Sequence, residues 1–258
     1  MRISVLQVAY DDVEPLPARV DRVAGLVRSA GASGADLVVL PELWGPGGFS
    51  YDRWAEGAQP LSGPIVTAMR EAAAAIGAHV HMGSLVERDG DRLYNTSVLL
   101  NPAGEIVATY RKIHLFGFGE GEPVLMSPGD SVVTAKVGDT TVGLATCYDL
   151  RFPELFRRLI DDGAEVIVVP AAWPARRVAH WSLLARARAV ENQVFLVACN
   201  TSGTHAGHLM GGHSAVIDPW GEALAEAGEG AESFVVDVDT ASVAVTREKF
   251  PVLRDRRL

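Results

Sequence analysis

Short apolar segments alternate with amphipathic segments along most of the chain. Residues 3–9 are apolar apart from Ser4 and Gln7, and residues 37–40 are entirely apolar, which is typical of buried strands. Residues 18–29 repeat apolar side chains at helical spacing, and residues 65–76 are rich in alanine, the strongest helix former. The first part of the chain is therefore predicted to consist of strand–helix units.

Two hairpins are predicted in the middle of the chain. Residues 80–86 and 93–100 have the apolar character of strands, and the Asp89-Gly90 pair between them favours a tight turn. Residues 132–137 and 141–146 form a second pair of predicted strands around another glycine-containing turn. Adjacent antiparallel strands are therefore expected beside the strand–helix units.

The second half of the chain returns to strand–helix alternation. The predicted helices are 154–160 and 179–192, and the predicted strands are 165–169, 194–199, 216–218 and 234–238. Strand–helix units combined with hairpins predict one α/β domain over residues 1–258, with two sheets inside and helices outside. From about residue 248 the sequence is basic and aperiodic, so we expect a frayed C-terminal tail.

Three polar residues stand directly after apolar strands. Glu42 follows residues 37–41, Lys112 ends a strand that begins after the turn at residues 101–104, and Cys147 follows residues 141–146. A helix near residue 153 is expected to leave the thiol on a sharp turn with free N–H groups, which suit an oxyanion. The helix and a nearby cation are also expected to favour the thiolate. A carboxylate, an ammonium and a thiol form a plausible catalytic set.

The segments around these residues resemble the three signature blocks of the nitrilase superfamily of carbon–nitrogen hydrolases. The blocks are Pro41-Glu42, residues 110–116 (YRKIHLF) and residues 147–155 (CYDLRFPEL). Their order also matches, and the resemblance runs from residue 3 to about residue 247. The chain is most similar to the omega-amidase and nitrilase-like amidase branch. The resemblance implies a four-layer α-β-β-α sandwich with two central mixed sheets and helices outside.

The same resemblance implies a mechanism. Cys147 attacks the carbonyl of a small linear amide and forms a thioester, while Glu42 removes the thiol proton, protonates the departing amine and activates water. Lys112 and the Tyr148 N–H stabilise the oxyanion. No cofactor takes part.

A second glutamate, which orients the lysine and the substrate, is expected in the glycine-rich segment 116–127. The spacing of the family assigns this role to Glu120, and Glu122 competes for it. The segment itself is predicted to form a loop over the site.

The substrate pocket is less well defined by the sequence. Trp173 follows a predicted strand end and is expected to wall the pocket. The branch resemblance implies an amide with a carboxylate at its far end, such as an omega-amide of a dicarboxylic 2-oxo acid. Arg53, Arg176 and Arg177 are candidates to bind that carboxylate, because a guanidinium group can donate two parallel hydrogen bonds to it. Solvated surface arginines are an equally good interpretation for each of them.

Charge and cysteine content narrow the class of protein. The formal net charge of −9 over 258 residues argues against a nucleic-acid binder, which needs a basic face. No run of about 18 apolar residues occurs, so no membrane partner is expected. Residues 1–9 lack the long apolar centre of a signal peptide. The two cysteines, Cys147 and Cys199, give no disulfide framework. We therefore expect a cytoplasmic protein.

The histidines do not have the spacing of a metal site. His79 and His81 lie on a predicted strand, and His205, His208 and His213 cluster in a glycine-rich segment. A metal site needs three or four converging ligands, usually with supporting carboxylates. We expect these histidines to be structural and predict no metal.

Other functions remain open at this stage. A nitrilase, a deaminated-glutathione amidase or an N-carbamoyl amidohydrolase would use the same Glu42, Lys112 and Cys147. A pseudoenzyme scaffold would need none of the three. A homodimer or a higher homo-oligomer is expected from the resemblance alone, which also implies that the C-terminal segment often lies at a dimer contact.

Overall fold

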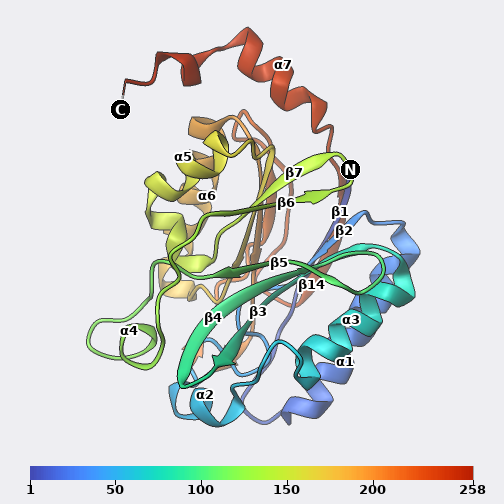
Figure 1. The fold of residues 1–258 in the computed structure, drawn as a ribbon, viewed down its shortest axis with the longest axis vertical. Helices are drawn as coiled ribbons and strands as arrows, with labels where there is room; N and C mark the ends of the chain where they lie inside the picture. Colours follow the sequence, from blue (N-terminus) through green and yellow to red (C-terminus); the bar gives the residue numbers. More distant parts are fainter. Residues whose placement is uncertain (258) are drawn as a thin grey trace.

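Two six-stranded sheets form the centre of the computed structural model, which describes residues 1–257 (Figure 1). The first sheet contains β14 (Glu232–Asp237), β1 (Arg2–Gln7), β2 (Leu37–Val39), β3 (His79–Asp89), β4 (Arg92–Leu100) and β5 (Ile106–Arg111), in that spatial order. Strands β1, β2 and β3 are parallel, and the other neighbours are antiparallel. The predicted hairpin with its turn after Asp89 is therefore confirmed.

The second sheet repeats this plan. It contains β13 (Ala223–Glu226), β12 (Ala215–Ile217), β9 (Phe195–Asn200), β8 (Val166–Ala171), β7 (Thr140–Leu144) and β6 (Val133–Val137). Strands β7, β8 and β9 are parallel, and their neighbours on both sides are antiparallel. Both sheets are mixed, as predicted.

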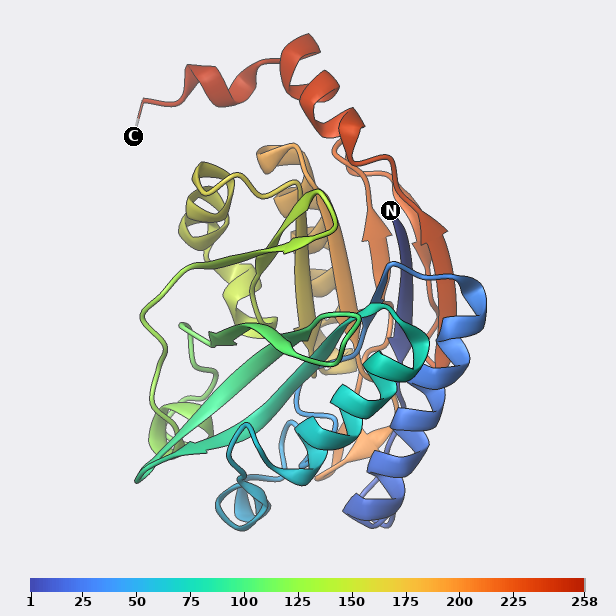
Figure 2. The same ribbon diagram turned by 45° about the vertical axis from the view of Figure 1, so that its right-hand side comes forward.

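Helices cover the outer faces of the two sheets (Figure 2). Helices α1 (Leu16–Ala30) and α3 (Pro64–Ile76) pack on the first sheet, and α5 (Pro153–Asp161) and α6 (Val178–Asn192) pack on the second. The four-layer α-β-β-α sandwich expected from the sequence is therefore confirmed.

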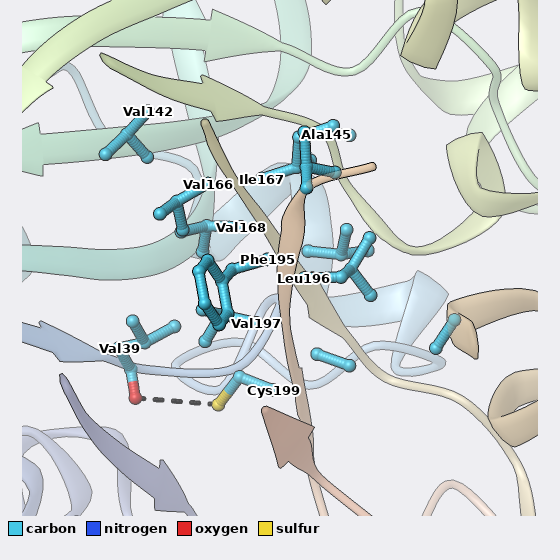
Figure 3. Close-up of a cluster of buried hydrophobic side chains, with 14 of the residues drawn as sticks. Val39, Val142, Ala145, Val166, Ile167, Val168, Phe195, Leu196, Val197 and Cys199 are labelled. Carbon is cyan, nitrogen blue, oxygen red and sulfur yellow. Dashed lines mark hydrogen bonds between the residues drawn. The ribbon is translucent and has the colours of Figure 1, made fainter. Parts of the chain in front are cut away.

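The inner faces of the two sheets share one apolar core (Figure 3). Side chains alternate along each strand, so Val39 faces this core while Val38 faces the helices. The Cys199 thiol on β9 donates a hydrogen bond to the Val39 carbonyl oxygen of β2 at 3.5 Å, which joins the two sheets. This shared core joins the two sheets, while one domain over residues 1–258 stays a prediction.

Several short elements connect the layers. They are η1 (Gly31–Ser33), α2 (Tyr51–Gly57), α4 (Glu122–Leu125), η2 (Cys147–Arg151), η3 (Ala175–Arg177), β10 (Thr204–His205) and β11 (His208–Leu209). Most of them were not predicted, because segments of two to seven residues are too short to display a hydrophobic period. Within residues 1–257, no helix combines the length and the apolar character that crossing a membrane requires.

The prediction of a frayed tail is wrong. Helix α7 (Ala241–Lys249) and η4 (Val252–Asp255) continue the chain past β14 and arch over one end of the sandwich (Figures 1 and 2). Gln193 donates a hydrogen bond to the Phe250 carbonyl oxygen at 2.7 Å, and Arg256 forms an ion pair with Asp161 at 2.6 Å. These contacts depend on residues far away in the sequence, so the aperiodic tail itself gave no sign of them.

Candidate active site

The three polar residues at strand ends meet in one small cavity. Glu42 lies three positions after β2, Lys112 follows β5 directly, and Cys147 lies three positions after β7. All three are buried and line a cavity of about 20 Å³ that is partly open to solvent. The remaining lining residues are Gly48, Phe49, Tyr51, Trp54, Phe116, Glu122 and Ala172. The structure therefore brings together the set that the sequence indicated.

The backbone around Glu42 is held by the bulge in β3. A side chain at Gly83 would collide with the Pro41 carbonyl oxygen, so only glycine allows this close approach. Next to it, the Ser84 hydroxyl accepts a hydrogen bond from the Leu43 N–H at 3.1 Å. The Glu42 carboxylate then accepts a hydrogen bond at Oε2 from the Ala172 N–H at 2.8 Å, just beyond β8 of the other sheet. Both sheets therefore position Glu42.

The Lys112 ammonium lies between two buried carboxylates. Its Nζ is 2.8 Å from Glu42 Oε1 and 3.0 and 2.8 Å from the two oxygens of Glu122. Burial by itself lowers the pKa of Lys112, but the attraction of Glu122 and Glu42 outweighs it and raises the pKa well above its usual value. Lys112 is therefore a permanent cation at the side of the cavity.

The second glutamate is Glu122, so the assignment to Glu120 is corrected. The Glu120 side chain is exposed, whereas Glu122 is 3% exposed and contacts Lys112. Three glycines with positive φ, at residues 117, 119 and 121, fold the segment back so that the Phe116 N–H donates to Glu122 Oε2 at 2.6 Å. The Glu122-Pro123 pair was the available signal in the sequence. Proline favours the first turn of a helix, so the pair indicates an ordered turn that starts at Glu122.

Cys147 occupies a strained turn. Its φ of 46° is rare for a residue other than glycine, and the short η2 helix starts at this residue, ahead of α5, which begins at Pro153 as predicted. Thr146 and Asp149 close the turn by a reciprocal capping box. Among residues 1–257, the Cys147 and Tyr148 N–H groups have no protein acceptor. These two donors are therefore free to bind an oxyanion.

The nearby cation favours the Cys147 thiolate, as expected, but burial outweighs it. Burial raises the pKa of the Cys147 thiol well above its usual value, and the adjacent Glu42 carboxylate raises it further, against the opposing effect of Lys112. The thiol is therefore protonated near neutral pH, and a base must remove its proton during the attack.

A buried carboxylate connects the turn of Cys147 to the strand that leads to Lys112. Asp149 Oδ2 accepts hydrogen bonds from the Tyr110 hydroxyl at 2.7 Å and the Thr146 N–H at 2.8 Å. Its Oδ1 accepts one from the His114 N–H at 3.0 Å and lies 2.7 Å from His114 Nδ1. Asp149 therefore fixes the position of the thiol relative to the ammonium.

Neither Tyr148 nor Trp173 lines the cavity with its side chain. The Tyr148 ring packs edge-on against Phe116 at a centroid distance of 5.2 Å. Trp173 is buried, and its indole N–H donates to the Arg177 carbonyl oxygen at 2.8 Å. Ala172 occupies the place that we expected for Trp173. The indole ring instead holds the backbone of Arg177.

The three candidate arginines are in different surroundings. Arg53 lies in a separate hollow beside Glu14, and Arg176 is exposed. The Arg177 guanidinium lies over the Phe116 ring, 5.2 Å from its centroid. Burial and the neighbouring Arg176 and Arg151 lower the pKa of Arg177. Arg177 does not line the cavity itself, but it is the candidate that packs on a lining residue, Phe116.

Comparison with known proteins gives the family. Residues 2–248 match the carbon-nitrogen hydrolase model. The chain is 43% identical to a 2-oxoglutaramate amidase of Paenarthrobacter nicotinovorans, over 99% of this chain and 89% of that protein. It is 35% identical to the omega-amidase NIT2 of Homo sapiens, over 99% of this chain and 95% of that protein.

A solved structure is similar over the whole length. It is a variant of the amidase from Nesterenkonia sp. AN1, in which the acetamide moiety of fluoroacetamide is covalently attached to the active-site cysteine. It superposes with a TM-score of 0.86 at 27% identity and covers 100% of this chain and 97% of its own. This chain belongs to the carbon–nitrogen hydrolase family, whose members are hydrolases of the nitrilase superfamily.

Proposed function

We propose that this protein is a cysteine-dependent amidase that hydrolyses a small linear amide to a carboxylic acid and ammonia. The observation that carries the proposal is the convergence of the Cys147 thiol, the Glu42 carboxylate and the Lys112 ammonium on one cavity. A nucleophile, a proton carrier and a fixed cation are the three groups that acyl transfer from an amide requires.

The first half of the reaction forms a thioester. Glu42 takes the proton of Cys147 as the sulfur attacks the amide carbonyl carbon. The carbonyl oxygen becomes an oxyanion, which the Lys112 ammonium and the free Tyr148 N–H stabilise. When the tetrahedral intermediate collapses, the C–N bond breaks and the proton passes from Glu42 to the nitrogen, so that ammonia leaves.

The second half returns the enzyme to its starting state. Water enters the place left by ammonia, and Glu42 removes its proton as the oxygen attacks the thioester carbon. The C–S bond breaks, the proton returns to the sulfur, and the carboxylic acid is released. Glu122 keeps Lys112 in position throughout, since it contacts the ammonium with both oxygens.

The substrate that we propose is an amide with a carboxylate at its far end. The similarity to a 2-oxoglutaramate amidase and to an omega-amidase supports this class. Arg177, which packs on the cavity-lining ring of Phe116, is the proposed anchor. Arg53 lies in a different hollow and is not part of the proposal.

Ammonia release tests the proposal against its alternatives. The panel contains omega-amides of dicarboxylic acids, deaminated glutathione, neutral aliphatic amides, N-carbamoyl amino acids and nitriles. Faster turnover of the carboxylate-bearing omega-amides is expected. A preference for neutral amides or nitriles would exclude the anchor but keep the catalytic set. Absence of hydrolysis across the panel would favour a pseudoenzyme scaffold.

Assembly and location are also proposals. We propose a homodimer or a higher homo-oligomer in the cytoplasm. Exposed apolar side chains on α6, Leu183 and Val190, are compatible with a contact between copies. Light scattering at micromolar concentrations that detects only a particle of the 27.5 kDa chain would contradict the assembly.

A further inference from the structure

The amide group of Asn95 lies between the two glutamates of the site. Its Nδ2 is 2.8 Å from Glu42 Oε1 and 2.6 Å from Glu122 Oε1. Asn95 lies on β4, is 1% exposed, and accepts the Lys112 N–H at its backbone oxygen at 2.9 Å. The atom that meets two carboxylate oxygens must be the donor, so this network fixes the orientation of the amide.

The hydrogen bonds distinguish the two glutamates. A carboxylate offers about two acceptor positions on each oxygen. In Glu122, Oε1 accepts from Lys112 and Asn95, and Oε2 accepts from Lys112 and the Phe116 N–H. Every acceptor position of Glu122 is therefore occupied, and this carboxylate has no free place for a proton.

Glu42 differs at one oxygen. Its Oε1 accepts from Lys112 and Asn95, so this oxygen is also saturated. Among residues 1–257, its Oε2 accepts only from the Ala172 N–H, which leaves one position open to them. The single open acceptor position of the glutamate pair is therefore on Oε2 of Glu42, the residue that interacts with the Cys147 thiol.

We propose that Asn95 is a positioning residue of the hydrolysis, whose amide clamps both glutamates and leaves Oε2 of Glu42 as the oxygen that carries the proton. Only the catalytic effect of the clamp rests on the proposed amidase function. The geometry of the clamp, two donated hydrogen bonds to two carboxylates, is given by the contacts themselves.

Other charged and titratable groups surround the clamp. Lys112 and Cys147 face the carboxylates directly, while Tyr51 on α2 and Tyr10 after β1 are close enough to be influenced by them. Burial raises the pKa of Glu122, and Glu42 raises it further, while Lys112 and the Phe116 N–H lower it. Removing a donor is therefore expected to make the carboxylates hold protons more tightly.

Two substitutions of similar shape test the clamp. Asn95→Leu removes both donated hydrogen bonds, and Asn95→Asp replaces the donor with a third carboxylate. The readout is the pH dependence of Cys147 alkylation by iodoacetamide, together with that of kcat/KM. The acidic limb is expected to move up by about one pH unit in Asn95→Leu and further in Asn95→Asp. A purely structural role would lower the rates and leave the limb in place, which would overturn the proposal.

Asn192 provides a matched control. It is a fully buried asparagine on α6 whose amide donates to the Arg188 carbonyl oxygen at 2.9 Å, away from the cavity. Asn192→Leu is expected to lower stability without moving the acidic limb. An equal shift in this control would also overturn the proposal, because the effect would not be specific to the glutamates.

A measurement on the unaltered protein decides the matter if the Asn95 variants do not fold. Neutron diffraction near neutral pH is expected to locate two deuterons on Asn95 Nδ2, directed at Glu42 and Glu122, and none on either carboxylate. A reversed amide or a deuteron on Glu122 would contradict the clamp. Failure of the amidase function would appear separately, as absent ammonia release with the alkylation limb still dependent on Asn95.

Discussion

The Tyr110 hydroxyl donates a 2.7 Å hydrogen bond to Asp149 Oδ2, and this contact joins the end of β5 to the turn that presents the thiol. Lys112 lies two residues after Tyr110, and Cys147 lies two residues before Asp149. The hydrogen bond between Tyr110 and Asp149 therefore helps to set the distance from the Lys112 ammonium to the Cys147 sulfur, although neither of those two residues takes part in it.

Tyr110→Phe is expected to lower kcat and to reduce stability by about 1–2 kcal/mol, because the buried Asp149 carboxylate loses one donor. Steady-state kinetics and thermal unfolding measure the two effects. Tyr94→Phe is the control, since that ring packs under Arg111 and its hydroxyl does not belong to the hydrogen-bond network of Asp149 within residues 1–257. Unchanged kcat in Tyr110→Phe would show that the bond does not position the thiol.

Cys147→Ala is expected to reduce turnover below about 1% of the unaltered enzyme while the protein stays folded, because the covalent step is lost. Cys199→Ala is its counterpart in the same chain. That thiol is buried between the sheets, so its loss should cost about 1 kcal/mol of stability and leave the rate within a few-fold. Comparable rates in the two variants would remove Cys147 from the mechanism.

Glu122→Gln and Glu120→Gln separate the two candidate glutamates. The first variant removes a charge that holds Lys112, and kcat is expected to fall by about 100-fold or more. The second alters an exposed side chain, and kcat is expected to stay within a few-fold. Kinetics on one omega-amide substrate suffices for the comparison. A larger loss in Glu120→Gln would restore the assignment made from spacing.

Lys112→Met is expected to cost about 3–5 kcal/mol of stability at neutral pH, because it leaves Glu42 and Glu122 buried without their cation. The cost should shrink in mild acid. Burial already raises the pKa of Glu122, so the folded variant keeps a proton that the unfolded chain loses above about pH 4.3. The unfolded state then binds fewer protons, and the free energy of unfolding falls as pH rises.

Urea unfolding between pH 5 and 8 measures this dependence. Lys136→Met, at an exposed lysine on β6, is the control and should change stability little at any pH. A Lys112→Met variant whose stability did not depend on pH would indicate that the carboxylates are solvated in the absence of the lysine.

Arg177→Met is expected to raise KM for a carboxylate-bearing omega-amide by about 10- to 100-fold, which corresponds to the loss of a hydrogen-bonded charge pair. For a neutral amide, the KM of the same variant should be almost equal to that of the unaltered enzyme. Arg53→Met should leave both substrates unaffected, since Arg53 lies in another hollow. Equal losses for charged and neutral amides would assign Arg177 to the scaffold.

The layers of the fold and the catalytic set could be predicted from local patterns. Val38 and Val39 alternate between two apolar environments, and such strands repeat through the chain. Glu42, Lys112 and Cys147 each follow a strand, and the family blocks gave their order. Each of these features is encoded by its own short stretch of sequence.

The remaining parts of the site depend on the path of the chain. Glu122 replaces Glu120 because three glycines with positive φ turn the segment, and sequence spacing does not contain those angles. Asn95 lies in the middle of a strand, where alternation indicates a face but not a partner. The choice of Arg177 depends on how the indole of Trp173 holds a backbone carbonyl.

The hydrogen bond from the Ala172 N–H to Glu42 Oε2 makes catalysis depend on the distance between the two sheets. Glu42 belongs to one sheet and Ala172 to the other, so the catalytic oxygen is correctly aimed only while the two sheets keep their native separation. Heat, pressure or an oversized side chain in the layer between the sheets should therefore abolish turnover. The circular dichroism spectrum should still show intact strands and helices. Enzyme activity would then report small changes in the distance between the two sheets.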